Sequence, residues 1–470
     1  MPAAQRDADR IKPASLNPFY FQYRGAPVLL LGGSVEDNLF QIPDLEAHLD
    51  LLASVGGNYI RCTMSSRDEG NVWAYPRDPG TGLYDLTRWD DEYWRRFSTC
   101  LELTAARDII VQVEIWATWD FYRLGDFWRH NAYNPANNST YDSAQSGLPE
   151  VWEYMAPERI NPFFETVPDL QNNTFLLAIQ KAFVDKLLSY TLPYDHVLYC
   201  MDNETNADPR WGFFWNEYIR SAAAAQGVTI ETTDMWDNWD PSNGAVPNTI
   251  RQDTSDHPFL DRSNVLVTIA HPERYSFVEI SNHNAQRGET HYKTAMFVRD
   301  RLQASDTIRP VTCVKIYGAD ASKEFSGTPR DGLERFWRNV FAGVAAVRFH
   351  RPTAGLGLSE VAQAHIRSMR MLTDELDVWS CEPHNDLLSD RATNSCYCLA
   401  DPGCVYAVCF LDGGQVRLDC SAAQGELAVR WLDVGASSWS APETARGATL
   451  DLQAPGEGFW AVLIQPHAQS

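Results

Sequence analysis

The feature that most constrains the fold is an eightfold alternation of short apolar runs with amphipathic stretches of helical spacing. The runs expected to form strands are 27–33, 58–63, 108–116, 197–205, 228–232, 275–280, 310–317 and 343–349. The stretches between them place apolar residues on one side of a helix. This order predicts an α/β fold, a (β/α)8 TIM barrel, between residues 28 and 377.

The pattern changes after Asp377. Residues 406–411, 415–419, 427–432 and 459–464 are short runs separated by turns, and several of them alternate between apolar and polar residues. Such runs are typical of antiparallel sheets that pack face to face. We therefore expect two domains, a barrel with an N-terminal extension over residues 1–380 and a small C-terminal antiparallel β-sandwich over 381–470.

The composition indicates a folded protein and excludes some partners. The 470 residues are 44% hydrophobic and 12% aromatic, which is enough to bury a large core. Lys and Arg number 39 against 62 Asp and Glu, and the net charge of -23 repels phosphate backbones and anionic membrane surfaces. Neither nucleic acid nor membrane is expected as a partner. Residues 1–18 carry charges and no apolar run, so a cytoplasmic or already processed product is expected.

Cysteine and histidine residues show no metal-binding spacing. Of the ten cysteines, six follow residue 380, and none of these belongs to a pair of CxxC motifs. We expect free or partly bridged structural cysteines. The histidines His271, His283, His291 and His350 lack the HxH or HExxH spacing of a zinc site, so substrate hydrogen bonding or capping is favoured. No metal and no cofactor is expected.

The run 197–201 leads directly into Asp202, Asn203 and Glu204. Carboxyl ends of barrel strands converge on one face, where TIM barrels keep their chemistry. We expect Glu204 to be a general acid and Asn203 to hydrogen-bond a hydroxyl group or an anionic intermediate. Splitting a glycosidic bond also requires a second carboxyl group.

The second carboxyl group is expected to be Glu279, which ends an apolar run and precedes Asn282 and His283. Glu114, Asp234 and Asp237 are further carboxylates at expected strand ends. The surrounding loops are rich in aromatic and amide side chains, which suit the apolar faces and hydroxyl rims of sugars. The residues expected to line the sugar site are Arg61, Glu114, Trp116, Asn203, Asn282, His283, Lys315 and Tyr317.

The barrel resembles the large clan of glycoside hydrolases in which the acid/base Glu follows an Asn at the end of strand four. Asn203-Glu204 matches that motif, and residues 57–61 are similar to the clan's second strand with its active-site Arg, here Arg61. Residues 84–90 and 109–113 are also similar to the clan. The resemblance implies a glycosidase that acts on a plant, microbial or algal polysaccharide or oligosaccharide through a two-carboxylate mechanism.

Within the clan, residues 19–27 and 30–33 resemble the apiosidase-type families. The small C-terminal sandwich of those families, once labelled a putative collagen-binding domain, is similar to residues 406–464, notably 429–434. The resemblance thus extends over most of the chain.

The chain departs from the clan at the end of strand seven, where the clan places its nucleophilic Glu. Lys315 stands there, within 312–318. Either the strand count differs by one, or the second carboxylate comes from elsewhere, or the protein does not hydrolyse glycosides. Lys315 then binds a hydroxyl or carboxylate, or forms a structural ion pair. The alternatives are a carbohydrate-binding barrel that lost catalysis and a sugar lyase in which Lys315 or a His takes the proton.

Overall fold

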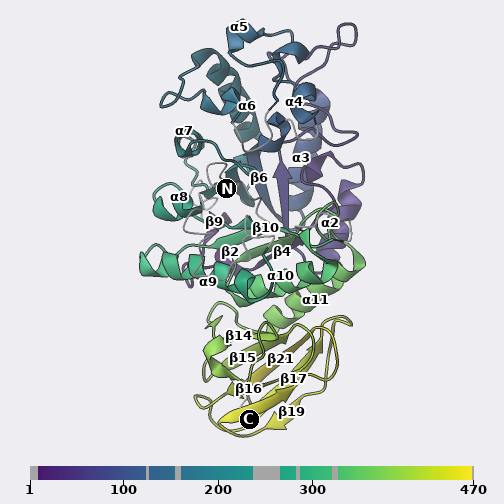
Figure 1. Ribbon diagram of the computed structural model, residues 1–470, viewed down its shortest axis with the longest axis vertical. Helices are drawn as coiled ribbons and strands as arrows, with labels where there is room; N and C mark the ends of the chain where they lie inside the picture. The colour runs from purple at the N-terminus through teal and green to yellow at the C-terminus, as the bar shows by residue number, and fades with distance from the viewer. Residues whose placement is uncertain are drawn as a thin grey trace.

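The computed structural model describes residues 9–122, 126–153, 160–236, 265–281, 286–319 and 326–467, and every structural statement below concerns these residues. The chain builds two parts that lie one above the other in Figure 1. The upper part contains a parallel sheet surrounded by helices, and the lower part contains antiparallel sheets (yellow-green to yellow) that end at the C-terminus.

The parallel sheet has eight strands in the order β8-β7-β6-β5-β4-β11-β10-β9. All of its strand pairs are parallel, which confirms the predicted (β/α)8 barrel. The strands are β4 (Leu30–Gly33), β5 (Tyr59–Thr63), β6 (Ile110–Trp116), β7 (Val197–Asp202), β8 (Thr232–Thr233), β9 (Val278–Glu279), β10 (Val311–Ile316) and β11 (Ala346–Phe349).

The barrel is nearly closed where β8 meets β9. These two strands are much shorter than the expected runs 228–232 and 275–280, because side chains replace part of their ladder. The Ser276 N–H donates to the Thr232 carbonyl at 2.9 Å, and the Thr232 N–H donates to the Ser276 hydroxyl at 2.9 Å. This junction brings the two ends of the sheet together without a further ladder.

The expected first strand, 27–33, is divided. Its start is β3 (Ala26–Val28), which forms an antiparallel sheet with β2 (Phe21–Tyr23) and β1 (Lys12–Pro13). Arg24 and Gly25 turn the chain between β2 and β3 with φ of 51° and 80°. Only Leu30–Gly33 enters the barrel. A Cβ atom on Gly32 would lie 2.0 Å from the Tyr59 carbonyl oxygen, so a glycine is needed where β4 approaches β5.

Helices follow the barrel strands as the sequence pattern predicts. Their starts carry capping side chains: Asp90 accepts the N–H of Tyr93 at 2.9 Å, and Thr328 forms a reciprocal capping box with Asp331. The helices are α2 (Leu45–Ser54), α3 (Asp91–Ala105), α4 (Phe127–His130), α5 (Ser143–Ser146), α6 (Thr174–Thr191), α7 (Pro209–Ala225), α8 (Val265–Ala270), α9 (Gly288–Ala304), α10 (Pro329–Phe341) and α11 (Glu360–Glu375). None of these described helices is long and apolar enough to cross a membrane.

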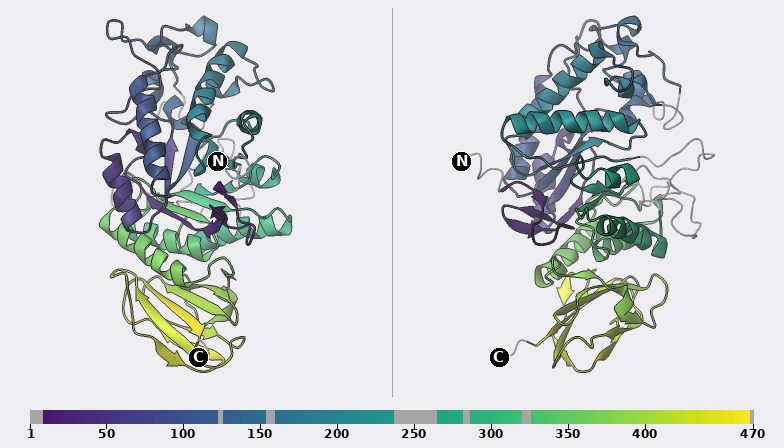
Figure 2. Two further views of the ribbon diagram at one scale, coloured as in Figure 1. Left: turned by 180° about the vertical axis from the view of Figure 1, so that it is seen from behind. Right: turned by 90° about the vertical axis from the view of Figure 1, so that its left-hand side faces the viewer.

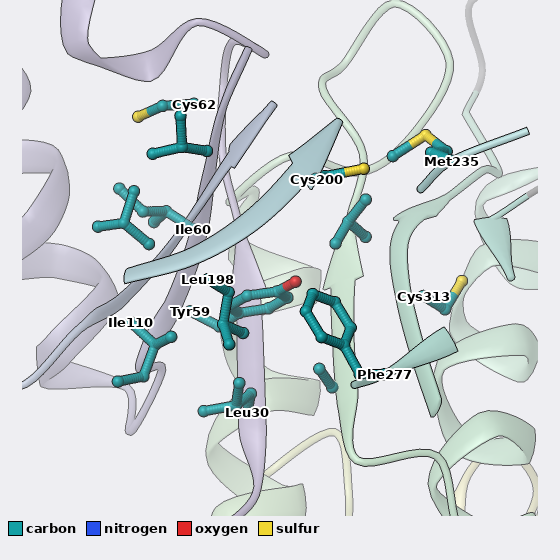
Figure 3. Packing of buried hydrophobic residues seen from close by; sticks show 14 of the residues in the cluster. Leu30, Tyr59, Ile60, Cys62, Ile110, Leu198, Cys200, Met235, Phe277 and Cys313 are labelled. Atoms are coloured by element: carbon teal, nitrogen blue, oxygen red, sulfur yellow. The ribbon is translucent and has the colours of Figure 1, made fainter. Parts of the chain in front are cut away.

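The barrel core consists of buried apolar side chains from strands and from residues that flank β8 and β9 (Figure 3). The labelled side chains are Leu30, Tyr59, Ile60, Cys62, Ile110, Leu198, Cys200, Met235, Phe277 and Cys313. Their burial on both faces of the sheet explains why the strands read as nearly continuous apolar runs.

The C-terminal part consists of two antiparallel sheets that enclose a second apolar cluster, which confirms the predicted sandwich architecture. One sheet contains β12 (Glu382–Pro383), β14 (Cys396–Asp401), β15 (Val405–Phe410), β21 (Trp460–Pro466), β17 (Leu427–Asp433), β18 (Ser438–Trp439) and β19 (Glu443–Ala445). The other contains β13 (Leu388–Ser389), β16 (Gln415–Asp419) and β20 (Thr449–Gln453). β14 and β20 were not expected from the sequence. All ten cysteines are free.

The two parts are packed together through α9, α10 and α11, which lie between the barrel strands and the C-terminal sheets in both figures of the whole chain (Figures 1 and 2). The carboxylate of Glu289 on α9 accepts hydrogen bonds from Nη1 and Nη2 of Arg391, at 3.0 and 2.8 Å, and from the Tyr397 hydroxyl at 3.1 Å. The Ser368 hydroxyl on α11 donates to the Val434 carbonyl at 2.7 Å. Polar bonds therefore supplement the apolar contact between the parts.

Candidate active site

Glu204 lies just beyond the carboxyl end of β7, and two donors hold its carboxylate. The Lys315 ammonium on β10 lies 2.9 Å from Oε1. The indole N–H of Trp119, from the short 3-10 helix Thr118–Phe121, donates to Oε2. The Lys315 side chain is 2% exposed and that of Glu204 is 16% exposed, so Glu204 is the more accessible member of this ion pair.

Asn203 belongs to the same cluster. Its Oδ1 accepts a hydrogen bond from Lys315 Nζ at 2.6 Å, and its backbone N–H donates to the Trp116 carbonyl at 2.9 Å. Its buried Nδ2 has no hydrogen-bond partner among the described residues. The structure therefore brings together Asn203, Glu204 and Lys315 from the predicted set and leaves one amide donor unused beside them.

The ion pair sets the charge of Glu204. Burial alone would raise the pKa of this carboxyl, but the Lys315 ammonium and the Trp119 N–H hold it below its ordinary value. Burial lowers the pKa of Lys315, although Glu204 opposes the change. Glu204 is thus an ionised carboxylate in the resting protein, whereas the sequence suggested a general acid that holds its proton.

Arg61 on β5 lies between two carboxylates. Its guanidinium is 2.9 Å from Asp37 Oδ1 and 3.5 Å from Glu114 Oε1. The second oxygen of Glu114 accepts the Thr63 hydroxyl. Because Glu114 is fully buried and engaged by Arg61 and Thr63, it serves this network and does not lie open at the barrel mouth.

Asp37, which the sequence analysis did not single out, connects Arg61 to residues that follow the neighbouring strand β11. Arg67 lies 3.0 Å from its Oδ2, His350 lies 3.4 Å from its Oδ1 and Arg351 lies 3.6 Å from its Oδ2. Burial opposes ionisation, yet the guanidinium groups of Arg61, Arg351 and Arg67 hold the pKa of Asp37 well below its usual range. Its signal in the sequence is its position: like Glu204, it follows a barrel strand closely.

Tyr317 lies at the end of β10, where its ring stacks on His350 with ring centroids 4.9 Å apart. This contact places Tyr317 beside the Asp37 network. Trp116 lies elsewhere: its ring is 2% exposed and packs against Trp215 at 5.0 Å and Phe163 at 5.4 Å. Only its backbone carbonyl reaches the site, through Asn203.

Glu279 lies deeper in the barrel than Glu204. It is aligned with Thr312, three residues before Lys315 along β10, which corresponds to about 10 Å of strand. It is 1% exposed, and it accepts the Ser281 N–H at 2.6 Å and the Thr312 hydroxyl at 2.8 Å. Burial raises its pKa to about 7. The structure therefore does not bring Glu279 to the exposed level of Glu204.

The remaining predicted residues fall into two groups. Asn282, His283 and Asp237 lie outside the described residues. Asp234 is described and fully buried, next to Asp202 beneath the end of β7. Trp119 was not selected from the sequence, although it begins an aromatic loop that follows β6. Among the described residues, no group of three His, Cys, Asp or Glu side chains is arranged to hold a metal ion.

The architecture defines a class of fold, a (β/α)8 barrel joined to a C-terminal antiparallel sandwich, with a carboxylate, an amide and an ammonium group at the barrel mouth. Glycoside hydrolases share this fold. A family 5 glycoside hydrolase from Bacteroides vulgatus is 11% identical, with a TM-score of 0.64 over 99% of this chain and 95% of that chain. Another glycoside hydrolase is 10% identical, with a TM-score of 0.64 over 99% of both chains.

A family 5 mannosidase from Rhizomucor miehei is 11% identical, with a TM-score of 0.50 over 79% of this chain and 100% of that chain. No model of a protein family and no curated protein matches the sequence. At such low identities the likeness establishes the fold, and the activity must be argued from the site.

Proposed function

We propose that the protein is a glycoside hydrolase that cleaves a glycosidic bond of a plant, microbial or algal polysaccharide or oligosaccharide at Glu204. One observation carries this proposal. Of the three glutamates expected in the site, Glu114 and Glu279 are buried, whereas Glu204 lies at the carboxyl end of a barrel strand with part of its side chain exposed. Barrel enzymes keep their reacting groups at this end.

The neighbours of Glu204 suit a sugar. The unused Nδ2 of Asn203 is a donor for a hydroxyl group, and the partly exposed Trp119 adds an aromatic surface whose N–H already holds Glu204. Sugars combine apolar C–H faces with hydroxyl groups, so an aromatic ring and an amide together match both.

The ion pair implies how Glu204 acquires its proton. Lys315 Nζ transfers a proton over 2.9 Å to Glu204 Oε1, and Glu204 passes it to the glycosidic oxygen as the bond to that oxygen breaks. Burial lowers the pKa of Lys315 and so favours this transfer, whereas the ion pair opposes it by holding the pKa of Glu204 below its ordinary value. A second group must then attack the anomeric carbon or activate water. Glu279 fills this role only if its bonds to Ser281 and Thr312 open.

Two amide variants test these assignments. We expect Glu204→Gln to lower kcat at least 100-fold, within the range that general acid catalysis contributes. Glu279→Gln tests the second group, since it removes the other candidate carboxylate, which is buried. If Glu279→Gln loses turnover, and sodium azide restores it with a glycosyl azide as the product, Glu279 is supported as the nucleophile. Unchanged turnover by Glu204→Gln contradicts the proposal.

A second candidate function is a barrel that binds carbohydrate without cleaving it. The Lys315–Glu204 ion pair favours it, because a carboxylate with both oxygens held by donors is also a stable binding group. Isothermal titration with oligosaccharides distinguishes the two functions. Binding with no released reducing ends at any pH from 4 to 9 supports this second function, whereas turnover excludes it.

A further inference from the structure

Beneath Glu204 lie two carboxyl groups that the proposed reaction does not use. Asp202 is the last residue of β7, and Asp234 follows β8; both are fully buried. The Asp202 backbone N–H donates to Asp234 Oδ1 at 3.2 Å, and this oxygen also accepts the Met235 N–H at 2.9 Å. The Asp234 carboxyl group is thus hydrogen-bonded to Asp202, the first residue of the Asp202-Asn203-Glu204 segment.

Helix α7 leaves room for the pair. A Cβ atom on Gly212 would lie 2.4 Å from Asp234 Oδ2, so a larger residue there would displace the carboxyl group. The Trp211 indole N–H donates to Asp202 Oδ1 at 3.2 Å. The Tyr275 hydroxyl donates to Asp234 Oδ2 at 3.5 Å, whereas Asp202 Oδ2 has no hydrogen-bond partner among the described residues.

The surroundings of the pair provide no compensating charge. Within the described ranges, neither Asp202 nor Asp234 forms an ion pair with a Lys, Arg or His side chain. The other titratable groups whose charges act in this region are Cys200 on β7, Tyr275 before β9, Glu114 on β6, Glu279 on β9 and Arg274. Two neighbouring carboxylates without a cation cannot both ionise readily in a dry interior, so one of them retains its proton.

We propose that one of the two carboxyl groups, Asp202 or Asp234, keeps its proton and that the singly protonated pair is a positioning device for Glu204. Glu204 has a φ of 56°, a left-handed conformation that costs about 1 kcal/mol or more for a residue with a side chain. Such a conformation persists only when its surroundings hold it. The Thr205 N–H donates to the Met235 carbonyl at 2.9 Å, so the segments of both aspartates hold Glu204 from either side.

The direction of the pKa shifts agrees with a proton retained by the pair. Burial raises the pKa of Asp234 to about 7, and burial together with Asp234 raises that of Asp202 well above its ordinary value. Because the folded state holds a proton that the unfolded state loses near pH 4, stability falls as pH rises from about 4 to 7 and levels off above the folded pKa.

The proton can be detected without any substrate. Infrared difference spectra at pH 6 are expected to show carbonyl stretches of buried protonated carboxyls, and Asp234→Asn is expected to weaken them while the contribution of Glu279 remains. The free energy of unfolding of Asp234→Asn is also expected to vary less between pH 4 and 7 than that of the wild type. Asp374→Asn, which alters an exposed carboxyl on α11, is the control. Equal pH dependence in Asp234→Asn and wild type overturns the proposal that the pair retains a proton.

The positioning role rests on the proposed function of Glu204. An NMR signal that does not depend on activity tests the positioning role separately from that function. The Trp119 indole resonance in ¹H–¹⁵N NMR reports the bond to Glu204. It is expected to move in Asp234→Leu but not in Asp374→Asn, and kcat/KM of Asp234→Leu is expected to fall about 100-fold. An unmoved resonance in Asp234→Leu overturns the positioning role. If Asp234→Leu fails to fold, Asp234→Asn at pH 8 serves in its place. If the Trp119 resonance moves in Asp234→Leu but the wild type has no glycosidase activity, only the proposed function is refuted.

Discussion

Lys315 is the residue that most changes the interpretation of the site. From its position alone it was a departure from the glycosidase pattern, and the structure shows it as the partner of both Glu204 and Asn203. A buried ammonium group and a carboxylate stabilise each other, and removing one leaves the other unpaired. The chemistry of Glu204 is therefore inseparable from Lys315.

Replacement of Lys315 by Met is expected to destabilise the fold and move the pH profile. Breaking a buried pair costs about 3 to 5 kcal/mol, which chemical denaturation at pH 7 measures. The ionised Glu204 stabilises the fold above its unfolded pKa, and this contribution is lost as pH falls through its lowered folded pKa. Without Lys315, burial raises the pKa of Glu204, so the alkaline limb of the activity profile should follow Glu204 itself, which must hold its proton to act as a general acid.

The double variant Lys315→Met with Glu204→Gln is the control, because it removes both charges. It should be more stable at pH 7 than Lys315→Met alone. Equal stability of the two variants would show that the pair is not coupled in solution.

At the scale of elements, the close approach of β4 to β5 is a strict requirement of the barrel. Gly32 is paired with Tyr59, whose carbonyl oxygen occupies the space of a Cβ atom. The neighbouring barrel strands leave little freedom for either strand to shift, since close-packed interiors transmit strain.

Gly32→Ala is therefore expected to lower the free energy of unfolding by about 1 to 3 kcal/mol or more, as overpacking does. Gly435→Ala is the matched control, because its added Cβ would lie 3.6 Å from the nearest side-chain atom at Asp433. Urea unfolding compares the two. A Gly32→Ala variant as stable as Gly435→Ala would contradict the close approach of the strands.

The barrel could be predicted because strands buried on both faces appear as apolar runs, and Glu204 could be placed because it follows one of them. The depth of Glu279 in the barrel could not be predicted, because it depends on how β9 is aligned with β10. Nothing in the sequence around Thr312 indicates that this residue is paired with Glu279. The contact of Lys315 with Asn203, which accompanies its pairing with Glu204, likewise depends on side chains 112 residues apart in the sequence. Asp37 and Trp119 belong to loops, whose course no periodic pattern predicts.

For the whole molecule, the contact between the barrel helices and the C-terminal sheets is the feature with the clearest consequence. We propose that residues 381–470 form a second domain that supports the barrel. Glu289 is central to this contact because its carboxylate accepts hydrogen bonds from the Arg391 guanidinium, the Tyr397 hydroxyl and the Asn394 N–H. Burial opposes its ionisation, but Arg391 holds its pKa below the ordinary value.

Glu289→Ala is expected to lower the melting temperature by several degrees at pH 7, because Arg391 and Tyr397 lose their shared acceptor. The wild-type advantage should disappear as pH falls through the lowered pKa of Glu289. Arg417→Ala is the control, since its pair with Asp451 is exposed and such pairs contribute about 0 to 1 kcal/mol. Scanning calorimetry measures both, and equal melting temperatures would contradict the role of Glu289.

The release of reducing ends from a panel of plant and algal polysaccharides, measured for wild type and Glu204→Gln side by side, tests the central claim most directly. The account predicts that at least one polysaccharide is cut by the wild type and that Glu204→Gln cuts it at least 100-fold more slowly while retaining affinity for its oligosaccharides. Equal release by the two proteins, or sugar binding without release by the wild type, would contradict Glu204 as the reacting group of a glycoside hydrolase.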